Sequence, residues 1–226
     1  MNVNLKYYIL YALAYGLVLL MGAFMYRALK SGPAWSRNFS HLAAGLISLP
    51  YPWLFTSHWW VLGLAVQSSL FLIGTRYLGW LASHHKVAHK SLGSVLFFAS
   101  LYLCFLAYTF SGLRELFVIP ILVLSLSDVS AAVVGRTKGT WPLARKKWSR
   151  KSDKTVAGSM AFFLTTLAVL QASFYYYLDL TFIHSLGMAM VISLISTASE
   201  ALSPWGTDNF SIPVVVLIFM HLGVVL

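Results

Sequence analysis

About eight apolar runs, each near the length that crosses a bilayer as an α-helix, occupy most of this chain. A transmembrane helix needs ~20 mostly apolar residues, because backbone groups in lipid must be paired internally. The alternating pattern of membrane strands is absent, so we expect helices. The runs are Tyr7–Met25, Phe39–Phe55, Trp59–Trp80, Gly93–Phe110, Leu116–Val134, Ala157–Leu178, Phe182–Leu202 and Phe210–Leu226.

Composition supports a membrane protein, since 59% of the 226 residues are hydrophobic and only 10% are charged. Soluble domains carry roughly 25% charged residues, so lipid is the solvent that suits this chain. We therefore predict an all-α polytopic integral membrane bundle in which residues 1–226 form one domain. About eight spans are expected, or seven if Pro50 and Pro52 stop the second run from crossing.

Basic residues are concentrated in alternate loops. The loops after the first, third and fifth runs carry most of them, and the segment from Arg136 to Lys154 alone holds eight. The opposite loops carry only Lys6 and Arg114. The positive-inside rule then places the basic loop 136–156 in the cytoplasm and both termini outside. These loops account for the net charge of +10, and the chain contains no nucleic-acid-binding module.

Three of the acidic residues in or beside the apolar runs are candidates for a site, because a charge is costly there and requires a specific role. Asp128 lies in the fifth run, Glu200 near the end of the seventh, and Asp208 with Asn209 just before the eighth. Each also has a structural interpretation: helix–helix hydrogen bonding for Asp128, pairing with a loop base for Glu200, and helix capping for Asp208 and Asn209. All three acids fall at the predicted cytoplasmic side.

The basic loop contains glycines, which allow backbone N–H groups to approach phosphate oxygens. It begins with Gly135-Arg-Thr-Lys-Gly139 and ends with Lys154-Thr-Val-Ala-Gly158-Ser159, where a helix N-terminus would favour an anion. With acids nearby for a divalent metal, this pattern indicates a nucleoside triphosphate site, although it is not a Walker loop. The loop alone is more typical of a basic patch on anionic lipid headgroups.

Histidines occur in two further candidate sites. His84, His85 and His89 lie in a loop with no matching acid or cysteine nearby, which favours a solvated loop over a metal site. Arg37 and His41 share one helical face at the start of the second run. They are suited either to a phosphate contact or to anchoring that helix at the membrane interface.

These motifs resemble, in order, those of the CTP-dependent lipid-alcohol kinases, which include dolichol kinase, phytol kinase and the CTP-dependent diacylglycerol kinase. The strongest block runs from Asp128 through Ala131 to Gly135-Arg-Thr-Lys-Gly139. The chain departs from the family at Asn38, where the family has lysine, and at Thr207, where an acid is common. The other matching blocks are Arg37 with His41, Lys90-Ser-Leu-Gly93-Ser94, Lys154 to Ser159, and Glu200 with Asp208 to Pro213.

The resemblance implies transfer of the γ-phosphate of CTP to the hydroxyl of a membrane lipid alcohol, with Mg²⁺ or another divalent cation. It implies that Asp128, Glu200 and Asp208 bind the metal or orient the acceptor. Arg37 and His41 would lie near the phosphates or the acceptor. The implied nucleotide-binding residues are Gly135, Arg136, Lys138, Gly139, Lys151, Lys154, Gly158, Ser159 and Asn209.

Two other functions remain open from the residues. A CTP-dependent phosphatidate cytidylyltransferase would need similar groups, but the usual His-Gly-Gly followed by Asp-Arg is absent. A small anion transporter would also place acids within helices, but the chain has no inverted repeat and its polar groups lie at one side. Phytol, other polyprenols and diacylglycerol are all candidate acceptors.

Overall fold

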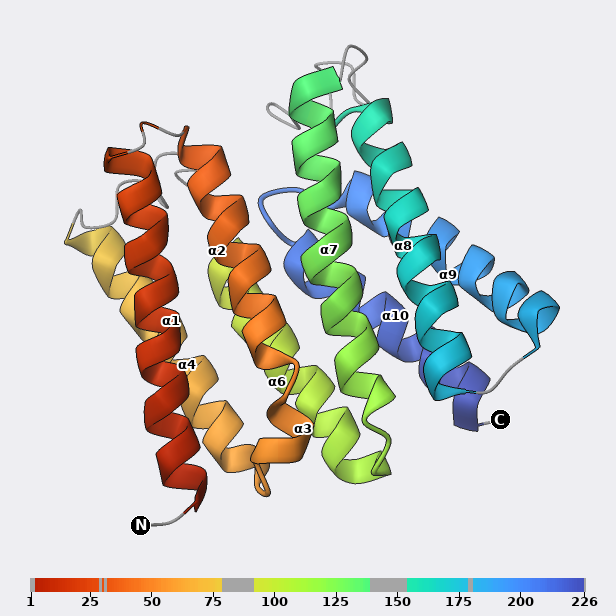
Figure 1. Ribbon diagram of the computed structural model, residues 1–226, viewed down its shortest axis with the longest axis horizontal. Coiled ribbons are helices and arrows are strands. Elements are labelled where there is room, and N and C mark those ends of the chain that lie inside the picture. Colours follow the sequence, from red (N-terminus) through yellow and green to blue (C-terminus); the bar gives the residue numbers. More distant parts are fainter. Residues whose placement is uncertain are drawn as a thin grey trace.

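The structure, a computed structural model, describes residues 3–28, 30, 32–78, 92–138, 154–178 and 181–225 (Figure 1). The regular elements of these residues are helices, as the all-α prediction states. They form a bundle in which successive long helices run in opposite directions. The helices are α1 (Val3–Arg27), α2 (Pro33–Ser48), α3 (Tyr51–Leu54), α4 (His58–Tyr77), α6 (Gly93–Ser111), α7 (Glu115–Lys138), α8 (Val156–Tyr177), α9 (Phe182–Leu202) and α10 (Asp208–Val225).

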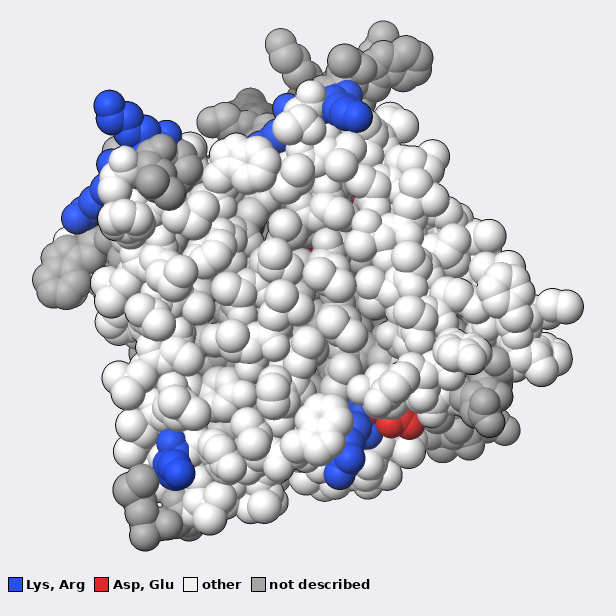
Figure 2. Space-filling model, viewed as in Figure 1, with Lys and Arg blue, Asp and Glu red and all other residues white. Residues whose placement is uncertain are grey.

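The surface of the bundle is that of a membrane protein. Of the described helices, five (α1, α6, α7, α8 and α9) are long and apolar enough to cross a bilayer, and α10 contains a shorter apolar stretch. Figure 2 shows Lys and Arg side chains near two opposite edges of the molecule, with a broad, almost uncharged band between them. The predicted class, a polytopic helical membrane bundle, is thereby confirmed. The count of eight spans and the orientation stay predictions.

The second apolar run forms two helices instead of one continuous span. Helix α2 ends at Ser48, and the single turn α3 begins at Tyr51, after Pro50. Proline lacks a backbone N–H and fits only the first turn of a helix, so Pro50 and Pro52 make the chain restart there. Helix α2 therefore has 16 residues, and the restart places the Tyr51 side chain in the core.

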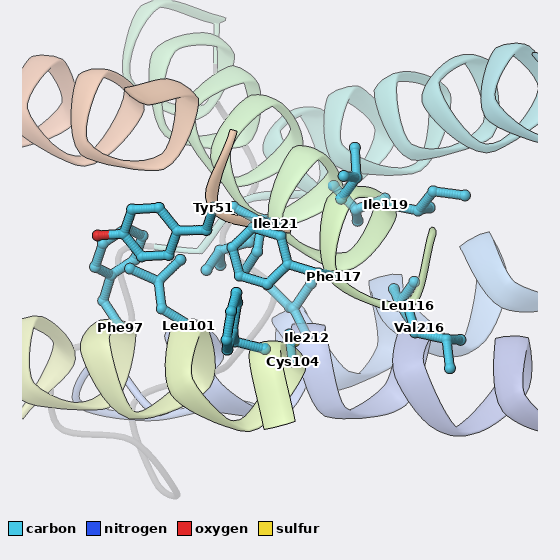
Figure 3. Packing of buried hydrophobic residues seen from close by; sticks show 14 of the residues in the cluster. Tyr51, Phe97, Leu101, Cys104, Leu116, Phe117, Ile119, Ile121, Ile212 and Val216 are labelled. Carbon is cyan, nitrogen blue, oxygen red and sulfur yellow. The ribbon is translucent and has the colours of Figure 1, made fainter. Parts of the chain in front are cut away.

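Helix α7 is the central element, because it packs against α2, α6, α8 and α10. Figure 3 shows the side chains of α3, α6, α7 and α10 that meet around its first half. The Tyr51 and Phe117 rings stack with their centroids 5.8 Å apart, and Leu101 and Cys104 of α6 are fully enclosed beside them. This packing fixes the helix that carries Asp128 in its second half.

Helices α2 and α7 approach each other closely at Gly45. A Cβ atom added to Gly45 would lie only 1.8 Å from the Ser125 Oγ atom, so any larger residue requires the helices to move apart. His41 lies about one turn before Gly45, and Asp128 lies about one turn after Ser125. The close approach therefore positions His41 opposite Asp128.

Candidate active site

Lys154 connects three helix ends at one end of the bundle. Its Nζ donates hydrogen bonds to Glu200 Oε1, at the end of α9, and to Asp208 Oδ2 (2.8 Å), at the start of α10. Ser159 Oγ, in the first turns of α8, donates to the other Glu200 oxygen (3.1 Å). Burial alone would lower the pKa of Lys154, but the surrounding carboxylates of Asp208, Glu200 and Asp128 raise it above its ordinary value. The carboxylates around Lys154 therefore favour its charged form.

The start of α8 is held against α7 by small residues. Thr155 caps α8, since its hydroxyl accepts a hydrogen bond from the Gly158 backbone N–H (3.1 Å). A Cβ on Gly158 would lie 3.0 Å from the Ala131 carbonyl oxygen and 3.3 Å from the Gly135 Cα atom. The two glycines thus face each other across the α7–α8 contact. This contact explains the missing side chains at both positions, while their approach to a nucleotide stays a prediction.

Asp128 joins this cluster to α2. Its Oδ2 lies 3.9 Å from His41 Nε2, and its charge interacts with those of Asp208, Lys154, Arg37 and Arg136. The His41 Nε2 atom is buried, and no group in the described part of the chain forms a hydrogen bond with it. A buried nitrogen without a partner is costly, so it marks a place where a ligand or water would bind. The site thus contains an acid and an imidazole side by side.

Arg136 is held by α2 near the end of α7. Its guanidinium lies over the Trp35 ring, 5.2 Å from the ring centroid. With its amide oriented to satisfy both neighbours, Asn38 accepts a hydrogen bond from Arg136 and donates one to the Ala34 carbonyl (3.1 Å). A lysine at position 38 would instead place a second cation against Arg136. Asn38, which stands where the family that the sequence resembles has lysine, therefore forms a hydrogen bond with Arg136 in this protein.

Asn209 ties the start of α10 to α6. Its Nδ2 donates to the Gly93 carbonyl (2.8 Å), and its backbone N–H donates to Asp208 Oδ1 (3.0 Å). Both Asp208 and Asn209 are buried. These bonds hold the start of α10 against α6, where the Asp208 carboxylate also accepts a hydrogen bond from Lys154, while helix capping by Asp208 and Asn209 stays a prediction.

A cavity of about 260 Å³ extends from this cluster between α1, α2, α4 and α6. Arg37, Ser40, His41 and Asn209 form its polar end. The remainder is lined mainly by apolar side chains, among them Leu19, Phe71, Leu72, Phe97 and Phe98.

The structure gathers most of the predicted site residues at one end of the bundle. Lys138 is exposed in the last turn of α7, while Gly139 and Lys151 lie outside the described residues, as do His84, His85 and His89. The sequence interpretation missed Trp35 and Ser40, although both lie within three residues of Arg37. The residues brought together are Arg37, His41, Asp128, Gly135, Arg136, Lys154, Gly158, Ser159, Glu200, Asp208 and Asn209.

Of the predicted metal ligands, Glu200 and Asp208 bind Lys154, whereas Asp128 lies beside His41. Within the described ranges, no three His, Cys, Asp or Glu side chains converge closely enough to hold one metal ion. The Lys154 ammonium group, which lies between Glu200 and Asp208, neutralises two of the three acids. The carboxylate oxygens are nevertheless the donor type that Mg²⁺ prefers. A metal at Asp128, Asp208 and Glu200 therefore stays a prediction.

The fold and this cluster define a polytopic membrane protein in which acidic and basic side chains gather at one end of its helices. The chain is 27% identical over 206 residues to the phytol kinase of Synechocystis sp., a match that covers 88% of this chain and 83% of that protein. No protein-family model matches the chain, and no solved structure matches it significantly. The similarity supports, at a coarse level, a lipid-alcohol kinase activity.

Proposed function

We propose that this protein is a membrane kinase that transfers the γ-phosphate of CTP to the hydroxyl of a lipid alcohol. The observation that carries the proposal is the cluster in which Lys154 binds Glu200 and Asp208 beside Asp128 and His41. Its residues come from five parts of the chain, and the chain is similar along most of its length to a phytol kinase. A purely structural ion pair would not require the additional acid, imidazole and guanidinium groups.

Phosphoryl transfer depends mostly on positioning and on neutralising phosphate charge. The acceptor oxygen forms a bond to the γ-phosphorus, and the bond from that phosphorus to the β–γ bridging oxygen breaks. CDP leaves with the electron pair of that bond. The hydroxyl proton passes to the His41–Asp128 pair, whose His41 Nε2 has no hydrogen-bond partner among the described residues.

The basic residues would bind the triphosphate. Arg136, Arg37 and Lys154 all interact electrostatically with Asp128, so phosphates bound by them would lie beside the proposed proton acceptor. Arg136 is already oriented by Trp35 and Asn38, which reduces the entropy that would be lost when it binds a phosphate. Lys138, exposed in the last turn of α7, would extend this cationic surface.

A divalent cation fits the donor chemistry of the site. Asp128, Asp208 and Glu200 offer hard oxygen ligands, and Mg²⁺ is commonly held by one or two carboxylates together with substrate phosphates. When bound, the cation would supply further neutralisation of the phosphate charge. Asp128 and Asp208 would hold it, because the charges of these two acids already interact across the site.

The orientation of the site belongs to the proposal as well. Nucleotides are cytoplasmic, whereas the acceptor alcohol dissolves in the bilayer. The uneven distribution of basic loops supports a cytoplasmic position for the end of the bundle that carries the cluster. The acceptor would be phytol, another polyprenol or diacylglycerol.

The test is an assay of purified protein in lipid nanodiscs with CTP, Mg²⁺ and a panel of these lipid alcohols. We expect a phosphorylated lipid and an equal amount of CDP. Release of pyrophosphate would instead identify a cytidylyltransferase, and absence of any product with every acceptor would refute the proposal.

The matched variants are Asp128→Asn and Glu115→Gln. Both replace a carboxylate by an amide on α7, but Glu115 lies in the first turn, at the opposite end of the helix. We expect Asp128→Asn to lower kcat by about 10²–10⁴-fold, the usual contribution of a positioned general base, and Glu115→Gln to leave it unchanged. Equal turnover of the two variants would remove Asp128 from the mechanism.

A further inference from the structure

We infer that the cavity between α1, α2, α4 and α6 binds the hydrocarbon chain of the acceptor, with the reacting hydroxyl at its polar end. This inference rests on the proposed function and specifies where the lipid lies. The cavity is lined by residues of α1, α2, α4 and α6 together with Asn209 of α10, and it touches the proposed catalytic cluster at Arg37, His41 and Asn209.

At the polar end of the cavity, two buried groups have no hydrogen-bond partner among the described residues. Within the described part of the chain, neither the Ser40 Oγ nor the His41 Nε2 forms a hydrogen bond, although both atoms are buried. Ser40 is 7% exposed, and both residues line the cavity. A hydroxyl group both donates and accepts, so a bound alcohol would satisfy the two together. Asp128 Oδ2 lies 3.9 Å from the same His41 nitrogen, so an alcohol bound there would lie next to the proposed proton acceptor.

The walls of the cavity suit an apolar chain and not a nucleotide. Phe97 and Phe98 of α6, Leu72 of α4 and Val18 of α1 are buried side chains that line it. Among the described lining residues, Arg37 alone carries a positive charge, so a triphosphate inside the cavity would lose hydration without sufficient compensation from them. Ligand pockets of ~300–1,000 Å³ enclose most of a drug-sized molecule. A cavity of about 260 Å³ therefore encloses only the part of a lipid chain nearest the hydroxyl.

The cavity reaches the lipid-facing surface between α1 and α4. Phe71, one of its lining residues, is 51% exposed, and the neighbouring lining residue Gln67 is also exposed. An alcohol dissolved in the bilayer would enter sideways at this opening, and the rest of its chain would remain in lipid. The same opening would allow chains of different length to bind.

The first test uses phytol that carries a diazirine on its chain, with wild-type protein in nanodiscs. We expect photolabel on peptides that contain residues 12–19 and 67–72. Excess unlabelled phytol should reduce this labelling, whereas phytane, the hydrocarbon without the hydroxyl, should not. Labelling elsewhere on the protein would overturn the inference, because the cavity would then bind no lipid. Equal competition by phytane would also overturn it, because the cavity would then bind any lipid chain without regard to the hydroxyl.

The second test fills the cavity from Gly16 of α1, which lines it. A Cβ atom at Gly16 would meet no atom within 4 Å, so a phenylalanine there enters open space. We expect Gly16→Phe to displace about two methylene groups of the chain and raise the KM for phytol about tenfold. The KM for CTP should not change.

The matched control is Gly187→Phe on α9. A Cβ atom at Gly187 also meets nothing within 4 Å, but Gly187 does not line this cavity. If Gly16→Phe does not fold, Ala12→Leu at the same cavity replaces it. An unchanged KM for phytol in the cavity variant would overturn the inference. Photolabelling does not require turnover, so a failed kinase assay with positive labelling would reject the proposed function and keep the lipid cavity.

Discussion

Replacement of Lys154 by methionine would remove the cation that joins the ends of α8, α9 and α10. The variant keeps a side chain of similar length but leaves two carboxylates, of which Glu200 is 2% and Asp208 is 8% exposed. Loss of one partner from a buried ion pair costs ~3–5 kcal/mol. Because the Lys154 side chain is itself 22% exposed, we expect the lower end, about 3 kcal/mol of unfolding free energy.

Equilibrium unfolding in mixed micelles, followed by circular dichroism, measures this loss. About 3 kcal/mol corresponds to roughly a 150-fold change in the unfolding constant. Lys6→Met, which removes an exposed lysine from α1, is the matched control and should leave the unfolding free energy within ~0.5 kcal/mol of the wild type. The comparison therefore separates the role of this site from a general effect of lost charge.

A triple variant that adds Glu200→Gln and Asp208→Asn to Lys154→Met removes the unpaired charges with their cation. We expect most of the lost stability to return, because the destabilisation comes from uncompensated carboxylates. Kinase activity should not return, since the groups that bind phosphate and metal are missing. Wild-type stability of Lys154→Met, or a triple variant no more stable than the single one, would refute the ion-pair reasoning.

Two further predictions concern packing and orientation. Gly45→Ala should cost ~1–3 kcal/mol, because its Cβ would overlap Ser125 Oγ, and the added change Ser125→Gly should recover part of it in the same unfolding assay. For orientation, cysteines at Ala28 and Ser111 lie at opposite ends of the bundle, and the native Cys104 is fully buried. In intact cells an impermeant maleimide should label Ser111→Cys alone, and labelling of Ala28→Cys would reverse the predicted topology.

The helical bundle was predictable from the sequence because hydrophobic length is a local property. Runs near 20 residues specify helices whatever their neighbours, and the structure confirms the membrane-bundle class. The break between α2 and α3 followed from Pro50 and Pro52, but its exact place depended on how Tyr51 packs against Phe117. That contact joins residues far apart in the chain, which a local pattern does not reveal.

The site was predictable to the extent that single acids are costly in a membrane. Asp128, Glu200 and Asp208 were identified for that reason, and the structure places them around one lysine. The sequence could not show that Gly135 and Gly158 face each other. A glycine that lets a phosphate approach the backbone cannot be distinguished by sequence from one that lets a neighbouring helix pack closely. It also could not show the cavity, whose described lining residues come from five helices.

The basic segment from Arg136 to Lys154 is attached to the acid cluster at both of its ends. Arg136, at its start, is fixed to α2 by Trp35 and Asn38, and Lys154, at its end, is fixed to Glu200 and Asp208. Both ends also interact with Asp128, so the segment begins and ends at the same acid. Under the proposed function, phosphates held by this segment must therefore lie beside Asp128 and His41, where the polar end of the cavity would present the acceptor hydroxyl. Under the same proposal, the anchored ends would set the distance between donor and acceptor.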